Sequence, residues 1–96
     1  MNIPDKIRVG GHEYKVLKNY VFEERADLNA QCASDVCEIR LGQSYREHCQ
    51  SKKEEIFLHE VIHAVDHVYN GGKLEESSVE NIGQGLYQAL KDNKIF

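Results

Sequence analysis

The segment His59-Glu60-Val61-Ile62-His63 lies in the middle of a long stretch with helical periodicity, and it constrains the fold more than any other feature of the chain. Apolar side chains recur at helical spacing through residues 51–69 without an interrupting Gly or Pro, which predicts one helix over this range. Residues four apart lie one above the other on a helix, so both imidazoles border the apolar face on the same side. The rest of the fold must therefore cover the apolar face and leave the two histidines accessible.

Both ends of this helix carry sequence signals. Ser51 and Glu54 form an S-x-x-E pattern, which predicts a capping box in the first turn. Asn70-Gly71-Gly72 follows the last periodic residue and predicts the C-terminal end.

Two imidazoles at this spacing on a helix suit a single Zn²⁺ ion. Glu60 is turned by about 100° around the helix axis from His59, so it can border the open side of the ion and take a proton from an attacking water without being a ligand. His67 continues the row, but the residue after His63 is Ala64 and not a glutamate. We therefore interpret His67 as a surface or supporting residue. The alternative interpretation of the motif is an ordinary helix with two solvent-facing histidines.

The N-terminal half has the alternation and turn residues of two β-hairpins. In the first hairpin, residues 6–9 and 13–17 flank Gly10-Gly11. Residues 20–27 are charged and weakly patterned, and we expect a connection there.

The second predicted hairpin consists of residues 28–33 and 36–41, on either side of Ser34-Asp35. A two-residue turn would place Cys32 opposite Cys37, in a cross-strand contact. A zinc-binding pair is the alternative interpretation of this C-x₄-C spacing. The odd number of cysteines, three, without a secretory signal is typical of reduced thiols.

After the central helix, Gly71-Gly72-Lys73 predicts a turn and residues 75–91 predict a second helix. Its apolar stripe is formed by Val79, Ile82, Leu86 and Leu90, and Gly83 allows close approach to the first helix. The expected fold class is α+β, with residues 1–96 forming one domain in which two hairpins pack on two helices.

A catalytic zinc site uses three protein ligands and an open position, so a third ligand must come from elsewhere in the chain. The candidates Glu75, Glu76 and Glu80 lie at the start of the second helix. Glu76 lies seven residues before Gly83 and shares the packing stripe, and Glu80 is one turn further along the same side. The helix dipole alone explains an acidic residue at position 75. Asp66, near His63, is interpreted as a solvated carboxylate or as a residue that orients an imidazole.

Charge and hydropathy exclude several other classes of protein. The formal net charge is −4 and no basic run is present, which argues against nucleic-acid binding. No apolar run approaches the roughly 20 residues that a membrane helix needs. The first ten residues are charged and lack an apolar signal-peptide region, so we expect a cytoplasmic protein.

These motifs resemble the small phage and prophage zinc metallopeptidases of the ImmA/IrrE-like group. The resemblance covers most of residues 6–93, and it rests on the H-E-x-x-H segment, on residues 37–41, on Glu76-x-x-Val79-Glu80 and on residues 85–93. It implies a minimal zincin fold, in which a small antiparallel sheet packs on an H-E-x-x-H helix and a glutamate-bearing helix. It also implies cytoplasmic, zinc-dependent hydrolysis of peptide bonds.

The resemblance also implies roles for individual residues. Zinc would be held by His59, His63 and Glu76, with Glu60 as the general base. Glu76-x-x-x-Glu80 is similar to the gluzincin pattern in which the first carboxylate binds the metal and the second holds a histidine ligand, and Glu80 is the alternative third ligand.

The expected substrate is a protein or peptide, such as a phage or mobile-element regulator, lying extended along residues 36–41 as the sheet edge. A donor to the oxyanion is also required, and the candidates are Tyr45, Tyr69, Tyr87, His48 and His67. Two alternatives stay open at this point. One is a catalytically silent zinc-binding interaction or regulatory module. The other is a toxin–antitoxin or repressor-regulating protein that cleaves one bound partner.

Overall fold

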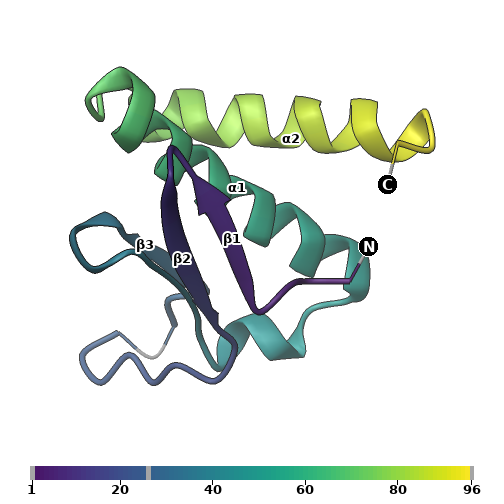
Figure 1. Cartoon of the computed structure of the whole chain (residues 1–96). Helices are drawn as coiled ribbons and strands as arrows, with labels where there is room; N and C mark the ends of the chain where they lie inside the picture. Colours follow the sequence, from purple (N-terminus) through teal and green to yellow (C-terminus); the bar gives the residue numbers. More distant parts are fainter. Residues whose placement is uncertain (1, 26, 96) are drawn as a thin grey trace.

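The computed structural model describes residues 2–25 and 27–95. Met1 and Phe96, at the ends of the expected domain, and Ala26, in the predicted connection, lie outside the described residues. The elements are β1 (Lys6–Val9), β2 (His12–Leu17), β3 (Ala30–Ala33), β4 (Glu38–Leu41), α1 (Gln50–Asn70) and α2 (Glu76–Asp92), with short 3₁₀ helices at Ser34–Val36 and Ser44–Glu47. The fold is therefore α+β, as predicted. The sheet packs on one side of α1, and α2 packs on another side of α1 (Figure 1).

The first hairpin forms as predicted. Val9 pairs with His12, which leaves Gly10 and Gly11 as a two-residue turn, and both have positive φ angles, 60° and 83°. A turn of this kind matches the twist of the two strands and favours glycine. A Cβ atom on Gly10 would collide with Val68 on α1. The glycine therefore also lets the end of the hairpin pack against the last turns of α1.

The second hairpin differs from its prediction in its turn. β3 and β4 are antiparallel, but Ala33 pairs with Glu38, so four residues connect them and not two. Three of these residues form the 3₁₀ helix Ser34–Val36, and Cys37 closes it with a φ of 54° and a hydrogen bond from its N–H to the Ser34 carbonyl, at 3.2 Å. The predicted Cys32–Cys37 cross-strand contact is therefore wrong, because Cys32 stands opposite Ile39.

The sheet is mixed and not antiparallel throughout. Its strand order is β1-β2-β4-β3, and β2 and β4 are parallel, with Val16 opposite Ile39. The two hairpins therefore share one sheet, which places β4 in the interior and β1 and β3 at the edges. The prediction that residues 36–41 form the sheet edge is wrong. The burial of Ile39 and Leu41, both fully inaccessible, agrees with this interior position.

The core lies between the sheet and the apolar face of α1. Tyr14 and Ile39 from the sheet belong to one buried hydrophobic cluster with Phe57 and Ala64 from the helix. Burial of such apolar surface is the main favourable contribution to folding. Among the described residues, no helix combines the length and the apolar character that crossing a membrane requires.

The first turn of α1 differs from the predicted capping box. The helix begins one residue earlier, at Gln50, with Cys49 as the N-cap, and no side-chain capping hydrogen bond forms there among the described residues. Glu54 is 1% exposed and accepts a hydrogen bond from the Tyr87 hydroxyl of α2, at 2.7 Å. The glutamate of the predicted box therefore joins the two helices instead.

Candidate metal centre

Two histidines of α1 and one glutamate of α2 converge on one point. The Nε2 atoms of His59 and His63 lie 2.7 Å and 2.9 Å from the two carboxylate oxygens of Glu76. The imidazole rings are 4.9 Å apart between centroids, and one donor atom from each of the three residues lies within 4.8 Å of the others. The sequence predicted this convergence for the two histidines from their four-residue spacing on a helix. The three side chains could hold a metal ion.

The turn between the helices determines where Glu76 lies. Asp66, which is buried in α1, accepts hydrogen bonds from the Leu74 N–H, at 3.3 Å, and from the Asn70 side chain, at 2.9 Å. Two residues after Leu74, α2 begins with Glu76. The interpretation of Asp66 as a solvated carboxylate is therefore wrong. Its partners are close in sequence, but its burial was not visible in the sequence pattern.

Glu80 contacts the other nitrogen of the first histidine. Its Oε2 atom lies 3.1 Å from His59 Nδ1, and its Oε1 atom accepts a hydrogen bond from the Gln84 side chain, at 2.7 Å. If Nε2 of His59 binds an ion, Nδ1 carries the ring proton and its N–H donates a hydrogen bond to Glu80. This hydrogen bond fixes the tautomer and the orientation of the ring. Glu75, the third acidic candidate, is the N-cap of α2 and does not belong to the cluster. The structure thus places Glu76 and Glu80 at the two different nitrogens of the same imidazole.

Glu60 lies on the sheet side of the cluster and is only 7% exposed. Burial raises the pKa of its carboxyl group to about 7, and the Glu76 carboxylate acts in the same direction. The His59 imidazole and a backbone hydrogen bond from Cys32 in β3 oppose this shift. A carboxyl group with a pKa near neutrality can both accept and return a proton at physiological pH, which is what a general base needs.

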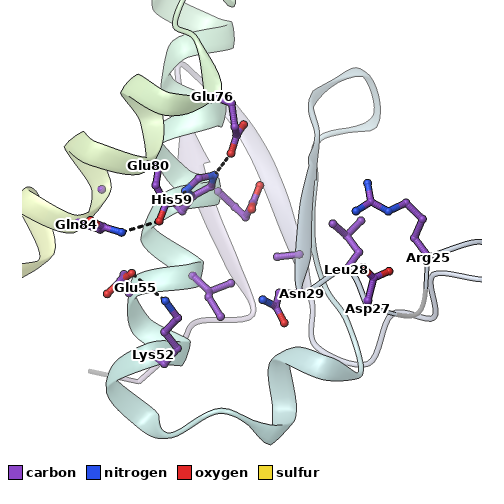
Figure 2. A pocket seen from close by; sticks show the side chains of 14 residues that line it. Arg25, Asp27, Leu28, Asn29, Lys52, Glu55, His59, Glu76, Glu80 and Gln84 are labelled. Atoms are coloured by element: carbon purple, nitrogen blue, oxygen red, sulfur yellow. Dashed lines mark hydrogen bonds and ion pairs between the residues drawn. The ribbon is translucent and has the colours of Figure 1, made fainter.

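Two hollows meet at the cluster. The first, of about 340 Å³, extends past Glu55 of α1 and Gln84 of α2 (Figure 2). The second, of about 740 Å³, extends along β3 past Cys32 towards His67 and Leu74. Six residues line both hollows: Arg25, Leu28, Ala30, His59, Glu60 and Glu76. The cluster of His59, His63 and Glu76 therefore lies at the middle of one continuous depression between α1, α2 and the β3 edge.

The structure narrows the candidates for the oxyanion donor. His67 lines the second hollow. Tyr45 is buried in the core, Tyr87 is bonded to Glu54, and His48 is bonded to the Asn29 side chain at 3.1 Å. Tyr69 is 73% exposed and lines neither hollow.

Sequence reasoning missed Arg25. It belongs to the irregular segment before β3, where no periodicity or motif marked it, and only the folded position of that segment brings it to the depression.

Two imidazoles and a carboxylate are a ligand set that Zn²⁺ takes in some catalytic sites, and here the donor atoms are close enough together to share one ion. All three cysteines are free thiols and stand outside this set. No protein-family model matches the chain, and no curated protein or solved structure matches it.

Proposed function

We propose that this chain is a zinc-dependent metallopeptidase that hydrolyses peptide bonds in a protein or peptide substrate. The observation that carries the proposal is the convergence of His59, His63 and Glu76 beside the buried carboxyl of Glu60. A structural zinc site is closed by four protein ligands, whereas three ligands with space on both sides leave a position for water and substrate. A purely structural site would also have no use for a carboxyl group with a pKa near 7 next to it.

The zinc ion, Glu60 and Glu80 each have a distinct role in the proposed reaction. Bound zinc supplies the Lewis acid that polarises the scissile carbonyl and makes water a better nucleophile. Glu60 takes the proton from the attacking water and later delivers it to the leaving amine. Glu80 keeps the His59 ring in the orientation that directs Nε2 towards the ion.

The substrate would lie in an extended conformation along β3. This strand is an edge of the sheet, and Ala30 and Cys32 line the depression beside Glu60. An edge strand offers unpaired backbone groups to an added strand, which gives affinity for a peptide of almost any sequence. Side chains of the peptide would then enter the two hollows on either side of the scissile bond.

The test has two steps on the same protein. Elemental analysis of protein purified without added metal should give one zinc per chain. A peptide library incubated with that protein and analysed by mass spectrometry should show cleavage. The Glu60→Gln variant should keep its zinc and its circular dichroism spectrum and lose cleavage, because an amide cannot accept the proton. A wild-type protein that holds zinc and cleaves nothing would instead support a silent zinc-binding module.

A further inference from the structure

The side of the depression that faces the metal cluster carries one cationic side chain at its centre. Of the six residues that line both hollows, three belong to the cluster and its base, and Leu28 and Ala30 are apolar. The remaining residue is Arg25. Figure 2 shows it on the segment across the first hollow from His59 and Glu76, with its guanidinium extending from that segment in their direction. In the peptide orientation proposed above, a residue shared by both hollows would lie beside the scissile bond and not beside a flanking side chain.

Residues on both sides of Arg25 in the sequence pack closely against Gly42. A Cβ atom on Gly42 would come within 2.7 Å of the Phe22 ring and 2.8 Å of the Leu28 carbonyl oxygen. Both distances are shorter than van der Waals contact allows, so the packing of the segment requires a glycine at this position. Phe22 and Leu28 flank Arg25 in sequence, and both therefore rest against the end of β4.

Hydrogen bonds hold the same segment on its C-terminal side. The Asn29 carbonyl accepts from the Gly42 N–H at 2.8 Å, and its side-chain oxygen accepts from the Ser44 hydroxyl at 2.9 Å. His48 lies 3.1 Å from the same side-chain oxygen. The Leu28 N–H also donates to the Arg25 carbonyl at 3.0 Å, which ties the backbone of the arginine to Leu28. Arg25 thus lies in sequence between two residues, Phe22 and Leu28, that both pack against Gly42.

The guanidinium of Arg25 is available to bind a ligand. No hydrogen bond or ion pair joins this guanidinium to another of the described residues. Lys52, which lines the first hollow alone, is already paired with Glu55 at 3.3 Å. A guanidinium is always charged at physiological pH and carries several N–H donors, which makes it suited to an anionic oxygen.

We propose that Arg25 is a catalytic residue that binds the anionic oxygen formed on the scissile carbonyl. The inference rests on the proposed peptidase function. Water oxygen bonds to the carbonyl carbon, the carbonyl π electrons move to its oxygen, and Glu60 takes the water proton. Collapse then restores the C=O bond, breaks the C–N bond and transfers the proton from Glu60 to nitrogen, leaving a carboxylic acid and an amine. Arg25 stays protonated throughout and donates hydrogen bonds to the oxygen while it is charged.

The first experiment does not depend on turnover. Inorganic phosphate, a tetrahedral oxyanion, is titrated calorimetrically into zinc-loaded protein at fixed ionic strength, because salt screens such contacts. Acetohydroxamate, which binds the zinc itself, is titrated in parallel. Arg25→Ala should weaken the affinity for phosphate at least about tenfold, in keeping with the strength of charge-assisted hydrogen bonds. The affinity for acetohydroxamate should not change. Arg8→Ala removes the same charged group from β1 and is the matched control, with both affinities retained.

The second experiment measures cleavage of a peptide identified from the library. Arg25→Ala should lower kcat by about 10²- to 10³-fold with little change in KM, the effect of removing a donor that acts in the transition state. Arg25→Lys should recover part of the loss. Equal phosphate affinity in active wild type and Arg25→Ala would overturn the role of Arg25 alone, as would a change confined to KM. A zinc-loaded wild type without turnover would overturn the peptidase function and, with it, this catalytic role.

Discussion

The two ends of the α1–α2 interface each contain a glutamate that contacts the opposite helix, but the two glutamates lie in opposite environments. Glu54, near the start of α1, is 1% exposed and accepts hydrogen bonds from Tyr87 and Lys91 of α2 as well as from Gln50. Glu76, at the start of α2, has a side chain that is 69% exposed and contacts the imidazoles of α1. One carboxylate is surrounded by donors, whereas the other borders open space.

This difference separates a structural contact from the contact that we propose to bind zinc. A buried carboxylate is costly to desolvate, so Glu54 is tolerated because its acceptor sites are occupied by protein donors. The nitrogens of two imidazoles and the oxygens of one carboxylate can serve as ligands of an ion. Because Glu76 is exposed, an ion and a substrate could reach this site from solvent. We therefore expect substitutions at the first end to change folding stability, and substitutions at the second end to change metal affinity.

The largest expected effect is the loss of metal binding. His59→Ala and Glu76→Ala should each purify without zinc, because two remaining ligands do not form a tight site. His67→Ala, one turn beyond His63, should keep one zinc per chain. Zinc at 1,000 times its dissociation constant stabilises a protein by about 4 kcal/mol, so a chelator should lower the melting temperature of wild type and not that of Glu76→Ala. Zinc loss in His67→Ala would mean that the metal is bound one turn further along α1.

Removal of the buried glutamate should have the next largest effect. Glu54→Ala should lower the free energy of unfolding by about 2–3 kcal/mol, the typical value of hydrogen bonds to a charged group, measured by urea denaturation. Its zinc content should not change. Glu55→Ala is the matched control, because the neighbouring Glu55 makes a surface ion pair with Lys52, for which about 0–1 kcal/mol is typical. Similar losses in both variants would contradict the distinction between the two ends of the interface.

Substitution of Glu80 tests how far zinc affinity at the Glu76 end of the interface depends on a second carboxylate. Glu80→Ala should retain zinc with about 10- to 100-fold weaker affinity, because the His59 ring loses the acceptor that fixes its tautomer. Competition with a chromophoric chelator ranks this variant against Glu76→Ala. If Glu80→Ala loses more affinity than Glu76→Ala, Glu80 is the ligand and Glu76 the supporting carboxylate.

The same contrast shows which parts of the molecule the sequence could predict. The placement of His59, Glu60 and His63 follows from the geometry of a single helix, so spacing alone was sufficient. Glu54 was assigned to a capping box because Ser51 lies three residues before it, whereas its actual partner Tyr87 is 33 residues away. Local patterns cannot reveal a partner that only tertiary packing supplies.

The sheet shows the same limit of local patterns. The hairpin around Gly10-Gly11 was predicted because a two-residue turn has its own sequence signature. The parallel pairing of β2 with β4 has no such signature, since it depends on how residues 18–29 cross to the far edge. That crossing also brings Arg25 to the depression, and this is why no motif marked it.

The smallest effect concerns a single hydroxyl at the structural end, and it has a defined pH dependence. Burial and the hydrogen bond to Glu54 raise the pKa of Tyr87 to about 12, from an ordinary value of 10. The native state therefore retains the phenolic proton at a pH where the unfolded chain has released it. The stability from this contact is complete below pH 10 and is lost as the pH rises through 12.

Tyr87→Phe keeps the ring and removes the hydroxyl, so it should cost about 1–2 kcal/mol at pH 7, in the range of a hydrogen bond to a charged acceptor. The difference in unfolding free energy between wild type and Tyr87→Phe, measured by urea denaturation at a series of pH values, should be constant from pH 7 to 9. Above pH 10 it should shrink, because deprotonation removes from wild type the donor that the variant already lacks. Equal stability of wild type and Tyr87→Phe at pH 7 would show that the ring, which both proteins keep, and not the hydroxyl bonded to Glu54, joins the two helices at this end.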